Sequence, residues 1–196
     1  MQTEMAKNRV KRGDYDGTVA NSRAPVMEFS PFPSLPGRVS AELPLVALPT
    51  APRCARLFVG DRLRRWNLAH LNDTTMLIAC ELVTNAVAAT GTVEMPVSYA
   101  ALHDLDLAMV AMRLLHTPES LFVEVWDRDP NPPIPGTPGL LDESGRGLTL
   151  LAALSKTWGA YLTQAPAAGK VVWAAIDIPP SPGERTNVRY GRAARE

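Results

Sequence analysis

The chain has little cysteine, no long apolar run and no excess of either charge. Its 2 cysteines among 196 residues can form neither a zinc cluster by themselves nor a disulfide framework. The 20 basic residues balance the 20 acidic ones, which argues against a dedicated nucleic-acid binder, because such proteins neutralise phosphates with a basic surface. The sequence contains no run of about 18 apolar residues, the length needed to span a membrane. The N-terminus lacks the apolar core of a signal peptide. We therefore expect a cytoplasmic protein that binds neither nucleic acid nor membrane.

Proline, in contrast, is abundant and unevenly placed. The chain has 18 prolines, about twice the roughly 5% of average usage. Most of them lie in three clusters, at residues 25–52, 130–138 and 179–182. Residues 1–38 are polar without a sustained period and predict an N-terminal tail that is disordered or only loosely docked. Residues 39–178 carry the apolar patterning and predict one domain, and residues 179–196 predict a C-terminal tail that arginines make basic.

The apolar residues of that domain follow the two common secondary-structure periods. Helical spacing predicts helices at 51–68, 72–91 and 147–158. Alternation and short apolar runs predict strands at 39–48, 105–115, 121–127, 161–165 and 170–178. Pro44 removes a hydrogen-bond donor from the first strand, which predicts that this strand lies at a sheet edge. The order predicts an α+β fold, a two-layer sandwich with helices covering one face of a mixed or antiparallel sheet.

A first candidate site lies on the predicted helix at 72–91. Glu81 and Asn85 are four residues apart, so they share one helix face about 6 Å apart along the axis. The acid could orient or deprotonate a nucleophile while the amide oxygen ligates a cation. An exposed polar stripe on an ordinary amphipathic helix explains the same pattern.

A second candidate is Asp127, at the end of the predicted strand 121–127. Alternation places it on the same face as Val123 and Val125. A carboxylate beside an apolar wall can accept a hydrogen bond from an exocyclic amine, as adenine recognition requires. The alternative is an Asp that ends a strand and begins a turn.

A third candidate is the segment Gly145, Arg146, Gly147 and Leu148 at the start of a predicted helix. Glycines there let backbone donors approach an anion, and the helix dipole favours phosphate. Arg146 adds a guanidinium fork for phosphate oxygens. Ordinary loop flexibility is the alternative explanation of the two glycines.

In this order the three segments resemble the Bergerat-fold ATPases, the superfamily of gyrase and the sensor histidine kinases. The phrases Glu-Leu-Val-Thr-Asn-Ala-Val at 81–87 and Ser-Gly-Arg-Gly-Leu at 144–148 are most similar to small bacterial serine kinases that act as anti-sigma factors. The resemblance covers about residues 40–178 and implies a Bergerat ATP-binding fold, a histidine-kinase-like ATP-binding domain, with ATP and Mg²⁺ as cofactors.

The resemblance also implies residue roles. Glu81 would be the catalytic base, Asn85 the magnesium ligand and Asp127 the adenine acceptor, and residues 145–148 would belong to the loop over the phosphates. Two features depart from the superfamily pattern. The superfamily usually follows the adenine-binding Asp with glycines, in the pattern Asp-x-Gly-x-Gly, but no glycine follows Asp127 at these positions. The superfamily also often has a threonine near the adenine on the last strand, and the strand that begins at Lys170 has none.

The implied function is a serine/threonine protein kinase that phosphorylates an anti-anti-sigma partner, sequesters a sigma factor, or does both. The partner would be a regulatory protein, a sigma factor or anti-anti-sigma factor, and the chain could form a homodimer. The missing glycines favour an alternative, a non-catalytic nucleotide-binding or partner-binding module of the same fold. A scaffold without any ligand is a third hypothesis, because a fold alone does not guarantee an activity.

Overall fold

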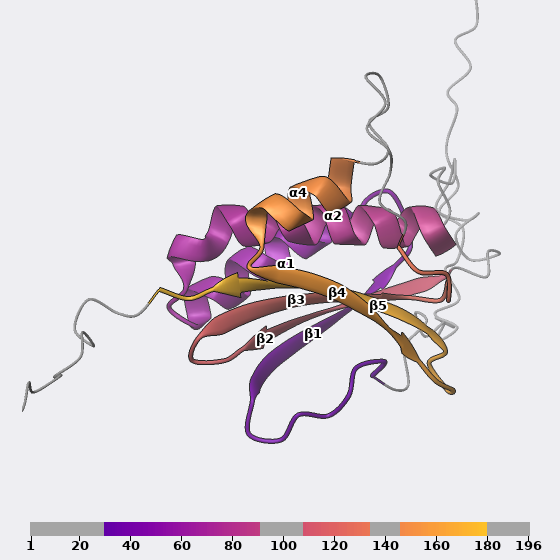
Figure 1. Cartoon of the computed structure of the whole chain (residues 1–196), viewed down its shortest axis with the longest axis horizontal. Coiled ribbons are helices and arrows are strands. Elements are labelled where there is room, and N and C mark those ends of the chain that lie inside the picture. The colour runs from indigo at the N-terminus through magenta and orange to yellow at the C-terminus, as the bar shows by residue number, and fades with distance from the viewer. Residues whose placement is uncertain (1–29, 91–107, 134–145, 180–196) are drawn as a thin grey trace, which may run out of the picture.

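The computed structural model describes residues 30–90, 108–133 and 146–179 of the chain. These residues form an α+β fold, with helices and strands in the predicted order (Figure 1). The helices are α1 (Ala51–Arg65), a short 3₁₀ helix (Ala69–Leu71), α2 (Asn72–Thr90) and α4 (Arg146–Leu154). The strands are β1 (Val39–Val46), β2 (Met109–His116), β3 (Ser120–Asp127), β4 (Thr157–Thr163) and β5 (Gly169–Asp177). No helix in these ranges is long and apolar enough to cross a membrane.

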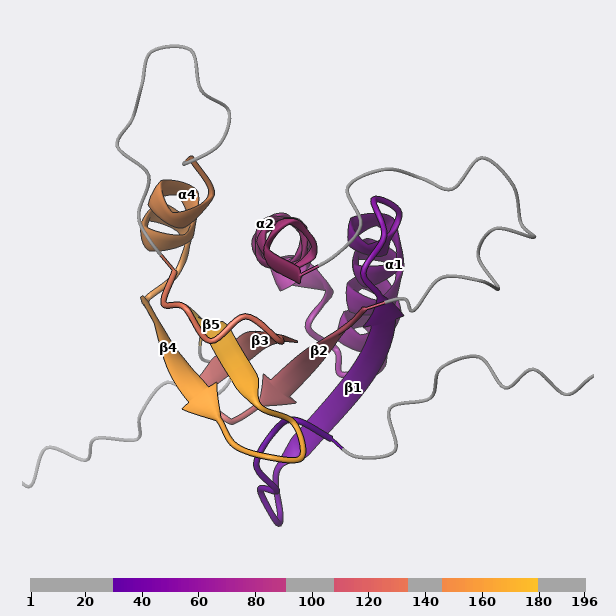
Figure 2. The ribbon, with the colours of Figure 1, turned by 90° about the vertical axis from the view of Figure 1, so that its right-hand side faces the viewer.

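The five strands form one sheet in the order β1-β2-β3-β5-β4, and every neighbouring pair is antiparallel. The helices α1, α2 and α4 all lie on the same face of this sheet (Figure 2). The predicted two-layer arrangement with an antiparallel sheet is thus present in the described residues. The strand that contains Pro44 lies at the edge, as its missing donor predicted.

The predicted end of the last helix and the predicted start of the strand after it, at residue 161, are both wrong, since β4 begins at Thr157. The helix expected over 147–158 ends at Leu154, and Trp158 belongs to β4, where it pairs with Ala174. The backbone N–H of Ser155 still donates to the Leu151 carbonyl, and its hydroxyl donates to the same oxygen. The hydroxyl thus occupies a carbonyl of the last turn, as serine does near helix ends. Three polar residues, Ser155, Lys156 and Thr157, separate the end of the helix from Trp158.

The main core lies between the sheet and the helices, because alternate strand residues face the helical layer. Met112 and Leu114 of β2 and Val123 and Val125 of β3 are at most 1% exposed there. Helix α2 contributes the buried Ile78 to the same cluster. The residues of β2 and β3 named here are apolar, so a polar side chain on this face calls for a specific partner.

The opposite face of the sheet carries a smaller apolar cluster and a buried ion pair. Phe32, from the segment predicted as tail, packs here with Trp126 and lies over the guanidinium of Arg113 at 4.7 Å. Arg113 pairs with Glu124 and also donates to the Pro33 carbonyl at 2.7 Å. The end of the segment predicted as tail thus docks on this face of the sheet, while residues 1–29 lie outside the described ranges.

Candidate functional site

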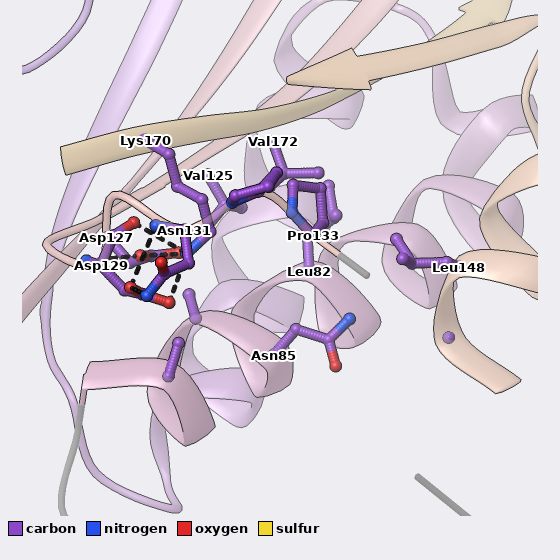
Figure 3. A pocket seen from close by; sticks show the side chains of 14 residues that line it. Leu82, Asn85, Val125, Asp127, Asp129, Asn131, Pro133, Leu148, Lys170 and Val172 are labelled. Atoms are coloured by element: carbon purple, nitrogen blue, oxygen red, sulfur yellow. Dashed lines mark hydrogen bonds and ion pairs between the residues drawn. The ribbon is translucent and has the colours of Figure 1, made fainter. Parts of the chain in front are cut away.

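A cavity of about 330 Å³ opens between α2, the start of α4 and the neighbouring ends of β3 and β5. It falls within the range of roughly 300–1,000 Å³ that is typical of small-molecule sites. Its walls are mainly apolar, and its polar groups gather toward opposite ends (Figure 3). The lining residues with apolar side chains are Leu82, Ala86, Ala89, Val125, Pro132, Pro133, Leu148 and Val172.

The end of the cavity at β3 and β5, which we call the base end, holds a buried ion pair. The sheet register pairs Asp127 directly with Lys170. Lys170 Nζ lies 2.8 Å from Asp127 Oδ1, and the two residues are 5% and 2% exposed. Lys170 Nζ also donates to the Asp129 carbonyl at 2.9 Å and to Asp129 Oδ2 at 3.2 Å (Figure 3). All three ammonium hydrogens thus have an acceptor within the protein.

The first residue of β5, Gly169, has no side chain, and this allows the strand to begin close to Asp127. A Cβ added at Gly169 would overlap the carbonyl oxygen of Asp127 and lie 2.9 Å from the indole nitrogen of Trp126. Any side chain at this position would push the start of β5 away from β3. Gly169 therefore helps to hold Lys170, the next residue, beside the carboxylate.

The two carboxyl groups at the base end differ in acidity. Burial raises the pKa of Asp127 above the ordinary Asp value, although the adjacent Lys170 ammonium acts in the opposite direction. A hydrogen bond from the backbone N–H of Asn131 is the main cause of a lowered pKa at Asp129. Asp129 therefore stays ionised further into the acid range than Asp127 does.

The other polar end of the cavity, which we call the phosphate end, lies where α4 begins against α2. A Cβ added at Gly147 would lie 3.0 Å from Glu81 Oε2 and 3.2 Å from Asn85 Nδ2. Glycine at 147 therefore lets the first turn of α4 approach both side chains. The N–H groups of a helix's first turn have no partners within the helix, which favours an anion at this end.

The structure brings most of the predicted site residues together. Asn85, Asp127, Gly147 and Leu148 all line the cavity. Glu81 lies beside Asn85 against Gly147, but it is not among the residues that line the cavity. Arg146 is the first residue of α4, and Gly145 lies outside the described ranges. The three separate sequence motifs thus converge on one place, with Glu81 at its margin.

No cluster of metal-binding residues marks the site. The described ranges contain no group of three or more His, Cys, Asp and Glu side chains arranged around a metal position. Magnesium bound with a nucleotide needs only one or two protein ligands, since phosphate oxygens and water supply the others. The exposed amide of Asn85 at the phosphate end fits that requirement.

Sequence reasoning missed the side chains that surround Asp127. Lys170, Asp129 and Asn131 all line the cavity, yet none of them was predicted as a site residue. One signal was present, since Lys170 is the single charged residue in the otherwise apolar segment 170–176. A lysine at a strand position that faces a core requires an acceptor, and Asp127 on the neighbouring strand supplies it.

No family model matches the chain, and no curated protein matches it significantly.

Proposed function

We propose that the protein binds a magnesium-bound purine nucleoside triphosphate and transfers its γ-phosphate to a serine of a regulatory partner protein. ATP is the nucleotide that the sequence resemblance implies, and a sigma factor or anti-anti-sigma factor is the implied partner. Binding without transfer would still allow the domain to sequester such a partner. This proposal extends the α+β sandwich to a Bergerat-type ATP-binding fold.

The convergence of three distant motifs on one cavity carries the proposal. Asp127 lies at the base end, apolar side chains form the walls, and Asn85 and Gly147 lie at the phosphate end. A nucleotide has the same sequence of properties, with a polar base edge, a flat apolar ring and a charged phosphate chain. The cavity thus matches a nucleotide better than a ligand of uniform polarity.

The residues at the phosphate end have separate roles in the proposed reaction. Gly147 and the first turn of α4 offer backbone N–H donors to the phosphate oxygens. Asn85 holds Mg²⁺ through its amide oxygen, and the bound ion would offset phosphate charge. Glu81 accepts the proton of the partner's serine hydroxyl while that oxygen bonds to the γ-phosphorus and the bond to the β-phosphate oxygen breaks.

Calorimetry on matched variants tests nucleotide binding. We expect Asn85→Ala to weaken magnesium-dependent ATP binding by about tenfold, the equivalent of one charge-assisted contact. The control is Thr84→Ala, because Thr84 is also exposed on α2 but does not line the cavity. The proposal fails if the unmodified protein gives no saturable signal with millimolar Mg²⁺ and ATP.

Transfer requires a second assay with a partner captured from a cytosolic extract. We expect Glu81→Gln to retain nucleotide binding but to lower phosphoserine formation on the partner by about 10²–10⁴-fold, the usual contribution of a general base. Normal phosphorylation by this variant would show that Glu81 is not the base.

The position of Glu81 favours a second candidate function, a nucleotide-binding module without transfer. Its carboxylate lies at the margin of the cavity rather than among the lining side chains. Under this alternative the captured partner binds in a nucleotide-dependent manner, and neither the unmodified protein nor Glu81→Gln produces phosphoserine.

A further inference from the structure

The base end of the cavity presents a hydrogen-bond acceptor and a donor side by side. Asp127 Oδ1 accepts from Lys170 Nζ at 2.8 Å and from the Asp129 backbone N–H at 2.9 Å. Asp127 Oδ2 has no hydrogen-bond partner among the described residues, and Asp127 lines the cavity. This second oxygen can therefore accept a hydrogen bond from a ligand.

One of the hydrogen bonds that Lys170 donates can also be transferred to a ligand. The longest of the three Lys170 hydrogen bonds, at 3.2 Å, goes to Asp129 Oδ2. The side chain of Asp129 is 25% exposed, and its Oδ1 keeps two hydrogen bonds from Asn131. Oδ2 can therefore exchange its lysine contact for water when another acceptor arrives, while Oδ1 stays in place. A ligand oxygen could then take the third ammonium hydrogen without leaving the buried charge unpaired.

Apolar side chains direct a flat ring toward this pair. Val125 and Val172 lie on the sheet side of the cavity, and Ala86 and Ala89 belong to the facing helix α2. The four side chains provide no hydrogen-bonding groups. A planar ring between them therefore has its polar edge satisfied mainly by Asp127 and Lys170.

The two common purines match this pair unequally. The edge of guanine carries an acceptor, O6, beside two donors, N1–H and the N2 amine, so it can pair with an ammonium and a carboxylate at once. Adenine offers one donor, its N6 amine, and the weaker ring acceptor N1. Its amine must also approach the carboxylate next to a buried ammonium, which is itself a donor.

We propose that the Asp127–Lys170 pair selects a 6-oxopurine nucleotide such as GTP over ATP, and that Lys170 determines this selectivity. The inference rests on the nucleotide binding proposed above and concerns only the base. Lys170 donates to O6, while Asp127 Oδ2 accepts from the N–H groups of the same edge. The additional charge-assisted hydrogen bond corresponds to about a tenfold difference in affinity.

The test is calorimetric titration of the full chain with GTP, ITP and ATP, each with Mg²⁺. ITP keeps O6 and N1–H but lacks the N2 amine, so it separates the lysine contact from the amine contact. We expect GTP to bind about tenfold more tightly than ATP, with ITP between them. This ranking is measured on the unmodified protein and does not depend on whether any variant folds.

Variants then assign the selectivity to one side chain. Lys170→Met removes the ammonium at similar length, and we expect the ratio of the GTP affinity to the ATP affinity to fall to about one, whatever the affinity of each nucleotide becomes. The control is Lys156→Met, because Lys156 also pairs with an aspartate, Asp177, but is 55% exposed and does not line the cavity. We expect this control to keep the unmodified ranking.

The outcomes separate this inference from the proposed function. Tighter binding of ATP than of GTP overturns the inference and leaves the proposed function intact. An unchanged GTP preference in a folded Lys170→Met protein also overturns it. Absence of binding by all three nucleotides overturns both proposals.

Discussion

Two buried ion pairs lie on opposite faces of the same sheet, and they differ in the groups that surround them. Arg113 and Glu124 face each other across β2 and β3, and Asp127 and Lys170 face each other across β3 and β5. Both pairs are cross-strand neighbours in antiparallel register. A cross-strand position therefore does not distinguish a structural pair from a functional one.

The groups around each pair make that distinction. The Arg113–Glu124 pair is covered by Phe32, and it also bonds to the Pro33 carbonyl and the Tyr161 hydroxyl. Groups of the described residues thus supply further hydrogen-bond partners to both Arg113 and Glu124, and an aromatic ring covers the guanidinium. The Asp127–Lys170 pair, in contrast, borders a cavity. We infer that the first pair stabilises the fold and the second is available to a ligand.

The largest expected effect comes from breaking the covered pair. Arg113→Met leaves the Glu124 carboxylate buried without a cation, so we expect the free energy of unfolding to fall by about 3 kcal/mol or more in urea denaturation. The double variant Arg113→Met with Glu124→Leu should recover at least half of this loss, because no buried charge remains unpaired.

A mild substitution beside the same pair serves as the control. Glu42 lies 4.0 Å from Arg113 but is 38% exposed, so Glu42→Gln should change the free energy of unfolding by less than about 0.5 kcal/mol. A similar loss in Glu42→Gln and Arg113→Met would contradict the distinction between the covered pair and its surroundings.

A smaller effect is expected from removing the cover itself. Phe32→Ala deletes an aromatic ring that belongs to the same apolar cluster as Trp126 and stacks with the Arg113 guanidinium, so we expect a loss of about 2 kcal/mol in unfolding free energy. Leu35→Ala is the matched control, since Leu35 belongs to the same segment but is 42% exposed. Equal stability of Phe32→Ala and the unmodified protein would mean that this segment does not cover the ion pair in solution.

The pair at the cavity should respond to pH in binding experiments. Because the pKa of Asp127 is raised, it takes up a proton above the ordinary Asp value of 3.8 as the solution is acidified. The protonated carboxyl no longer pairs with Lys170 and is a poorer acceptor, so nucleotide affinity should fall about tenfold for each pH unit below the raised pKa.

Two isosteric variants separate this titration from that of the nucleotide phosphates. Asp127→Asn should lack the decrease in affinity, whereas Asp129→Asn should retain it. Asp129 has a lowered pKa and is still ionised where Asp127 gains its proton. Identical pH profiles of Asp127→Asn and the unmodified protein would rule out Asp127 as the titrating group.

The smallest expected effect is at the phosphate end. Gly147→Ala places a methyl group 3.0 Å from Glu81 Oε2 and 3.2 Å from Asn85 Nδ2, so both side chains must shift slightly. We expect nucleotide affinity to fall about threefold, while the unfolding free energy changes by less than about 0.5 kcal/mol, because alanine improves helix propensity. Unchanged affinity in calorimetry would show that Gly147 does not need to approach these side chains.

The sequence by itself determined the order of helices and strands and the sheet-edge position of the strand with Pro44. These features follow from local properties, namely the spacing of apolar residues and the missing proline donor. The same local rule placed Asn85 on a helix and Asp127 at a strand end, where the structure finds them. It failed at Trp158, because an apolar residue satisfies a helix pattern and a strand pattern equally well.

Only the tertiary structure decided which side chains meet. Lys170 and Asp127 are 43 residues apart, and their contact depends on the register between β3 and β5, which no local pattern specifies. The docking of Phe32 over Arg113 and the approach of Gly147 to Glu81 likewise require packing between distant segments. The sequence therefore determined where a carboxylate stands at the end of a strand, and the fold placed a buried ammonium beside it.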